Sequence, residues 1–156
     1  MKQIFLFLFL AFAISSCCKK KEATPNLCVE PQIGIGDCIT DSNQLKNLII
    51  GKWNWTQTKS EAWVVYKENP CTDTFNLALD FQNNNLVRIF ENGNYTSTGT
   101  YTFFQNYTSS ISIIDTLPSS HPQLHQLAGA VRICGNYLII DNSPVDGPIQ
   151  IFLKAE

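Results

Sequence analysis

From residue 51 to the C-terminus, short runs of β-forming residues alternate with Asn, Gly and Pro, and this pattern limits the fold more than any other feature. Residues 75–81 and 149–153 place apolar side chains at every second position, as in strands with one buried face. Asn92-Gly93 separates two such runs and is a strong hairpin signal, because both residues tolerate positive φ. Short strands at regular spacing predict an all-β fold, a sandwich or a barrel. The expected strands are residues 51–58, 62–67, 75–81, 86–91, 95–103, 110–115, 128–134, 137–141 and 149–153.

A short helix is expected immediately before the first of these strands. Asp41 or Ser42 can cap its N-terminus, because a side-chain oxygen there accepts from a free backbone N–H. Leu45, Leu48 and Ile49 then have the spacing of one apolar helix face. The sequence therefore predicts one helical turn or two packed on an all-β domain.

Residues 1–16 have the order of a secretory signal. Lys2 is followed by an uncharged apolar run, residues 4–14, and two serines lead directly into Cys17. The run is too short for a transmembrane helix, which needs about 20 residues. Small residues followed by Cys resemble the lipobox of bacterial lipoproteins, with an ordinary cleaved signal as the alternative. The resemblance implies a diacylglyceryl group on Cys17, cleavage before it, and anchoring in the cell envelope, at either face of the outer membrane.

The charged residues argue against a nucleic acid partner, and a cluster of them follows the lipobox. The chain has 11 Lys and Arg against 13 Asp and Glu and shows no basic face, so we expect no nucleic acid partner. Residues 19–22, Lys-Lys-Lys-Glu, follow the lipobox directly. They are interpreted as a solvated tether, or alternatively as a segment attracted to anionic headgroups.

Six cysteines suit an oxidising compartment. The first is assigned to the lipid, and Cys18 to the tether. Cys28, Cys38, Cys71 and Cys134 allow three pairings. We favour Cys28–Cys38, which share a short segment rich in Pro and Gly, together with Cys71–Cys134. Beyond the adjacent pair at the lipobox there are no closely spaced cysteines, so neither a metal site nor a cofactor is expected.

Residues 48–53, Leu-Ile-Ile-Gly-Lys-Trp, resemble the Gly-x-Trp entry motif of lipocalins, and in particular the short lipocalin-like lipoproteins of Bacteroidetes-type bacteria. The order of helix, motif, hairpin meander and apolar last strand matches as well. The resemblance implies an up-and-down barrel with Gly51 and Trp53 at its closed end. The family often stacks an Arg from beyond the last strand on this Trp, whereas this chain has Lys154 there, so the stacked cation does not follow from the sequence.

Two functions are compatible with such a barrel, since eight strands enclose a space that side chains can fill or that holds one small ligand. The first is a lipid-anchored module holding a small apolar or amphipathic ligand. The residues expected to contact that ligand are Trp55, Phe81, Tyr101 and Phe103. The alternative is a structural or interaction lipoprotein, or an inhibitor, with a filled barrel and an envelope protein as its partner. The expected organisation is a signal peptide, a tether with a disulfide loop, and a barrel domain: residues 1–16, 17–40 and 41–156.

No set of residues predicts catalysis, so an enzyme is not expected. His121 and His125 have the spacing of a helical metal pair, but a proline stands between them in the loop-like residues 116–126. They are interpreted as surface histidines. Ser119 and Ser120 lie nearby, but neither is in a Gly-x-Ser-x-Gly turn.

Overall fold

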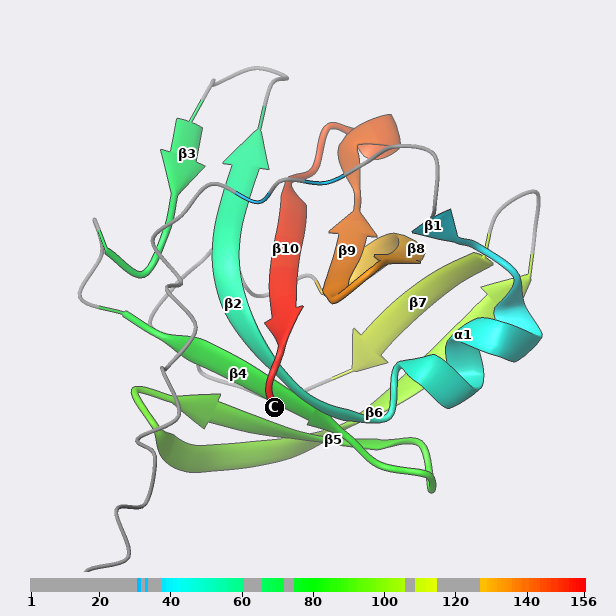
Figure 1. Cartoon of the computed structure of the whole chain (residues 1–156), viewed down its shortest axis with the longest axis horizontal. Coiled ribbons are helices and arrows are strands. Elements are labelled where there is room, and N and C mark those ends of the chain that lie inside the picture. The colour runs from blue at the N-terminus through cyan, green and yellow to red at the C-terminus, as the bar shows by residue number, and fades with distance from the viewer. Residues whose placement is uncertain are drawn as a thin grey trace, which may run out of the picture.

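The structure is a computed structural model that describes residues 31, 33, 38–60, 66–71, 75–105, 109–114 and 127–156. Over these residues the chain forms one sheet of ten strands, a short α-helix and a short 3-10 helix, Ser143–Val145 (Figure 1). The helix is α1 (Ser42–Leu48). The strands are β1 (Cys38–Ile39), β2 (Gly51–Ser60), β3 (Tyr66–Glu68), β4 (Leu77–Phe81), β5 (Leu86–Glu91), β6 (Asn94–Gln105), β7 (Ser109–Ile114), β8 (Ala128–Cys134), β9 (Tyr137–Asp141) and β10 (Ile149–Lys154).

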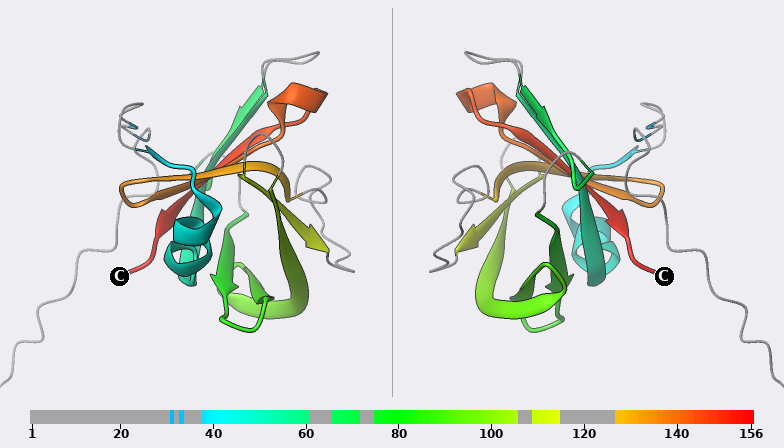
Figure 2. Two further views of the ribbon diagram at one scale, coloured as in Figure 1. Left: turned by 90° about the vertical axis from the view of Figure 1, so that its right-hand side faces the viewer. Right: turned by 90° about the vertical axis from the view of Figure 1, so that its left-hand side faces the viewer.

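Eight of these strands close into an antiparallel up-and-down barrel, which confirms the predicted fold class. β2 and β4 to β10 follow one another around the barrel, and β10 pairs with β2 to complete it. The two remaining strands are short: β1 pairs with the end of β8, and β3 pairs with the end of β2. The views in Figure 2 show the strands crossing steeply around this barrel, with α1 packed beside it. The sheet thus begins at Cys38, inside the segment predicted as tether.

The predicted helix is confirmed, but its buried face is narrower than expected. The Asp41 side chain accepts a hydrogen bond from the backbone N–H of Gln44 at 3.0 Å, as an N-cap does. Leu45 and Ile49 are fully buried in the barrel core, whereas Leu48 is 37% exposed. Residues four apart lie one above the other on a helix, so Leu45 and Ile49 together form the face of the helix that packs on the barrel.

The predicted hairpin at Asn92-Gly93 joins β5 to β6, and both residues have positive φ, 51° and 81°. Just beyond it, the β5–β6 register shifts by one residue. Strict alternation would place Tyr95 on the same face as Tyr101. The shift instead turns Tyr95 outward, where it is 58% exposed and its ring lies 6.0 Å from that of Phe90.

Apolar residues form two separate clusters. The larger fills the barrel and contains fully buried side chains from α1 and from strands all around the sheet. The smaller lies on the outer face of β8, β9 and β10 and consists of Cys134, Ile139 and Ile151, with Ile33, Cys38, Tyr137 and Ile149 packed against them. The functional question is which of these two regions can receive another molecule.

Candidate functional site

Three of the four residues expected to contact a ligand form one row of rings. Phe81 and Tyr101 meet edge to face with centroids 5.1 Å apart, and Tyr101 and Phe103 do so at 6.0 Å. Phe81 is fully buried and Tyr101 is 4% exposed, whereas Phe103 is partly buried. The three rings are therefore one another's packing partners, in the geometry that aromatic pairs prefer.

Trp55, the fourth of these residues, has a ring partner of its own. Its indole lies 6.1 Å from the ring of Phe75, and its N–H donates to the hydroxyl of Thr58 at 2.9 Å. Trp55 is 2% exposed, so both its apolar surface and its polar atom are satisfied inside the protein. The structure thus buries three of these residues in the core and packs Phe103 against it, and Phe81, Tyr101 and Phe103 form one row.

A polar hollow of about 430 Å³ reaches two members of the row from outside. Tyr101 and Phe103 line it together with α1 and two asparagines, Asn83 and Asn85. The Tyr101 hydroxyl donates to the backbone oxygen of Gln82 at 2.9 Å, and burial raises the pKa of Tyr101 above its ordinary value. The hollow therefore ends on the edge of the core and offers mainly amide and hydroxyl groups.

The Gly-x-Trp segment lies where α1 joins β2. Gly51 has φ +114°, a conformation that residues with a side chain rarely adopt. Trp53 is fully buried and donates its indole N–H to the backbone oxygen of Ile49 at 2.6 Å. Lys154 covers this ring with its ammonium 5.0 Å from the centroid, and also donates to the backbone oxygen of Leu48 at 3.1 Å. A cation over this ring, which did not follow from the sequence, is thus present as the ammonium of Lys154.

The outer face of β9 and β10 is hollowed as well. The outer groove is a hollow of about 590 Å³ whose floor consists of Ile139, Ile149 and Ile151. Pro31, Ile33 and Cys38 form one wall, and Thr40, Gln57, Lys59 and Arg132 complete the lining. Sequence analysis missed this site, since it treated the apolar positions of residues 149–153 as core.

The faces of β10 explain that error. Ile149 and Ile151 point outward, whereas Gln150 and Phe152 are buried on the opposite side, where Phe152 joins the barrel core. Apolar residues therefore occupy both faces of this strand. Strand β9 also has apolar residues on both faces, since Leu138, Ile139 and Ile140 follow one another directly. A strand with one buried face would alternate apolar and polar residues, so this run could have indicated a second apolar surface.

One disulfide borders the groove through Cys38 and corrects the predicted pairing. Cys38 is bonded to Cys134, directly opposite it in the β1–β8 ladder, with Cα atoms 4.2 Å apart. The predicted pairs Cys28–Cys38 and Cys71–Cys134 are therefore wrong. Cys71 is also disulfide-bonded. The favoured pairing rested on closeness in sequence, whereas β1 pairs with a strand whose cysteine lies 96 residues later in the chain.

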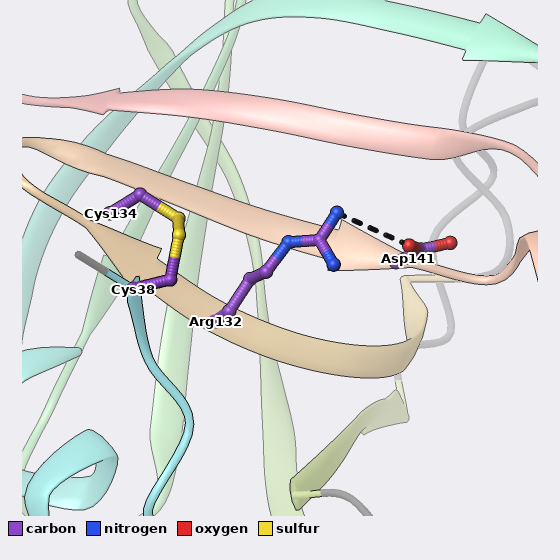
Figure 3. The surroundings of a disulfide bond; sticks show 4 residues. All are labelled: Cys38, Arg132, Cys134 and Asp141. Carbon is purple, nitrogen blue, oxygen red and sulfur yellow. Dashed lines mark hydrogen bonds and ion pairs between the residues drawn. A yellow bond between two sulfur atoms is a disulfide. The ribbon is translucent and has the colours of Figure 1, made fainter. Parts of the chain in front are cut away.

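Arg132 stands beside this disulfide on β8 and reaches across to β9 (Figure 3). Its guanidinium lies 3.4 Å from a carboxylate oxygen of Asp141, and its side chain is 40% exposed. The other carboxylate oxygen of Asp141 accepts from the backbone N–H and the hydroxyl of Ser143. Ser143, in the loop after β9, thus fixes the Asp141 carboxylate. Only one of the five guanidinium N–H donors of Arg132 is engaged with that carboxylate.

Several predicted features lie outside the described residues: Cys17, Cys28, Ser119, Ser120, His121 and His125. In the part of the chain that the structure covers, no three or more His, Cys, Asp or Glu residues gather in a way that could hold a metal ion. Nor does that part contain a helix with the length and apolar character needed to cross a membrane. Comparison of the chain with protein-family models, curated proteins and solved structures finds no match.

Proposed function

We propose that this chain is a cell-envelope lipoprotein, held to the membrane by a lipid on Cys17, whose filled barrel acts through its outer surface. The packing of the interior is the observation that supports this most directly. Phe81 has no exposed surface and Trp55 has almost none, because each is covered by neighbouring side chains. A ligand in the barrel would have to displace these rings, whereas the outer groove already offers space.

The envelope location has support from two parts of the chain. The signal-like residues 1–16 end at Cys17, in the arrangement that resembles a lipobox. The Cys38–Cys134 disulfide supports it independently, since such bonds persist in oxidising compartments outside the cytoplasm. The helix, the Gly-x-Trp segment and the closed meander also support a relationship to short lipocalin-like lipoproteins.

A second candidate function is the one expected first from the sequence, namely a binding module that holds a small amphipathic ligand at the barrel. The hollow beside Tyr101 and Phe103 favours it. Its lining is mainly polar, however, and the rings beneath it are packed against one another. We therefore place this function second.

Anchoring is tested with the full chain and its Cys17→Ser variant in cells fed an alkyne-labelled palmitate. The wild-type chain is expected to carry the label and to sediment with membranes, while the variant loses the label. Cys18→Ser is the matched control, because it changes the neighbouring thiol and leaves the predicted lipid site intact. A Cys17→Ser chain that keeps the label would refute the anchor.

Filling of the barrel is tested by diffraction from xenon-pressurised crystals of the wild-type chain and of Phe81→Ala. Xenon enters apolar cavities but not packed cores. We expect a xenon atom beside residue 81 in the variant and none inside the wild-type barrel. Xenon in the wild-type interior would instead support the ligand-holding module.

A further inference from the structure

We propose that the outer groove binds a single-chain amphiphile with an anionic headgroup, of which a long-chain fatty acid is the simplest example. This inference rests on the proposed surface function and names the kind of molecule that the surface takes. It assigns a site outside the barrel, on residues that the sequence treated as core.

The floor of the groove matches an acyl chain. Ile139, Ile149 and Ile151 present only hydrocarbon on this face; Ile139 and Ile151 are 3% and 4% exposed, and Ile149 is partly exposed. The groove measures about 590 Å³, within the range of about 300–1,000 Å³ typical of small-molecule sites. The outer face of a barrel normally carries polar side chains, whereas here Ile33 and Cys38 pack on an apolar floor, and the hollow beside Ile149 is the space that remains for another molecule.

The charged residues among the described lining, Lys59 and Arg132, are both cations. The guanidinium of Arg132 contacts Asp141 through one nitrogen, and its side chain is 40% exposed. Its other N–H groups can donate to a carboxylate in the parallel geometry that arginine favours. An apolar floor with a cation at its edge is complementary to a hydrocarbon chain that ends in an acid.

The wall of the groove connects the site to the expected anchor. Ile33 packs against the isoleucine floor, Pro31 lines the same groove, and the Cys38–Cys134 bond ties β1 to β8. Cys17 lies 14 residues before Pro31 in the sequence, so a lipid on it would tether the groove near the bilayer in which fatty acids dissolve. The bilayer is therefore the source of ligand that the site would sample.

The test uses the full chain in membrane vesicles with a diazirine-bearing palmitate as photoprobe, followed by mapping of the labelled peptides. We expect saturable labelling of peptides that contain β9 and β10, displaced by unlabelled palmitate. Hexadecanol, which lacks the charge, should compete at least tenfold more weakly. Laurate should also compete less well than palmitate, because each buried methylene strengthens binding roughly fourfold.

Arg132→Gln is the diagnostic variant, since this exposed side chain can be changed without altering either apolar cluster. Its affinity for palmitate is expected to fall roughly tenfold, the effect of losing one charge-assisted hydrogen bond. Arg88→Gln, the same exchange at an exposed position on β5, is the matched control and should leave the affinity unchanged.

Three outcomes would overturn the proposal. Labelling without saturation, or equal competition by hexadecanol, would refute the groove as an anionic-amphiphile site and leave the surface function standing. Equal affinity of the Arg132→Gln and wild-type chains would refute the assigned headgroup contact. Saturable label on peptides of β4 and β6 would refute both the groove and the filled barrel, because the ligand would then lie inside.

Discussion

The barrel interior and the outer groove are both apolar, but only one of them is closed by its own side chains. Inside, aromatic rings contact one another and leave almost no surface exposed. Outside, Ile139 and Ile151 are buried with Ile33 and Cys38 packed against them, but Ile149 is partly exposed and the face is hollowed beside it. Hydrophobicity alone therefore does not identify a binding site in this protein; incomplete packing does.

The largest expected difference between the two regions is in their response to truncation. Phe81→Ala should lower the free energy of unfolding by about 3–5 kcal/mol, because it leaves a cavity in a packed core. Ile149→Ala on the partly exposed groove floor should cost less than about 1.5 kcal/mol, since solvent already reaches the site. Urea denaturation of both variants measures this, and equal losses would remove the distinction between the two regions.

Removal of the Cys38–Cys134 bond should affect the groove more selectively. The double variant Cys38→Ala, Cys134→Ala is expected to lose about 2–4 kcal/mol of stability, since the bond closes a loop of 96 residues. Palmitate labelling should weaken at the same time, because the wall formed by Pro31 and Ile33 is no longer fixed. Urea titration and photolabelling report the two effects, and labelling unchanged in a destabilised chain would show that the wall is not needed.

The Gly-x-Trp segment provides an effect of intermediate size. Trp53→Phe should lower the free energy of unfolding by about 1–3 kcal/mol. The backbone oxygen of Ile49 loses its hydrogen-bond donor, and the ammonium of Lys154 then lies over a phenyl ring, which binds a cation more weakly than an indole does. Thermal unfolding measures the change, with Tyr95→Phe at an exposed position as the control. A loss as small as that of the control would mean that the indole N–H contributes little.

The smallest effect is the pH dependence contributed by Tyr101. Burial raises its pKa in the folded chain, so the folded state keeps a proton that the unfolded chain releases above about pH 10. Stability from this group is thus complete below pH 10 and is lost as the pH rises toward the folded-state pKa. Denaturation at pH 9 and 11 should show a smaller loss for Tyr101→Phe than for the wild-type chain. Identical losses would show that Tyr101 does not contribute.

Much of the architecture was predictable because it depends on neighbours in sequence. The alternation in residues 75–81 and the Asn92-Gly93 turn determine a strand and a hairpin without reference to the rest of the chain. Successive hairpins then place each strand beside the next, so a meander follows directly. The Asp41 cap is equally local, because its partner is three residues away.

The site was not predictable in the same way, because it depends on contacts between distant segments. The pairing of β10 with β2 includes a register shift and sets Ile149 and Ile151 outward, although the same apolar alternation fits an inward face. The partner of Cys38 was likewise decided by barrel closure, which brings β1 to β8. Local sequence therefore determined which residues form strands and turns. Only tertiary structure decided which apolar face is packed and which is open, because that depends on how the ends of the sheet meet.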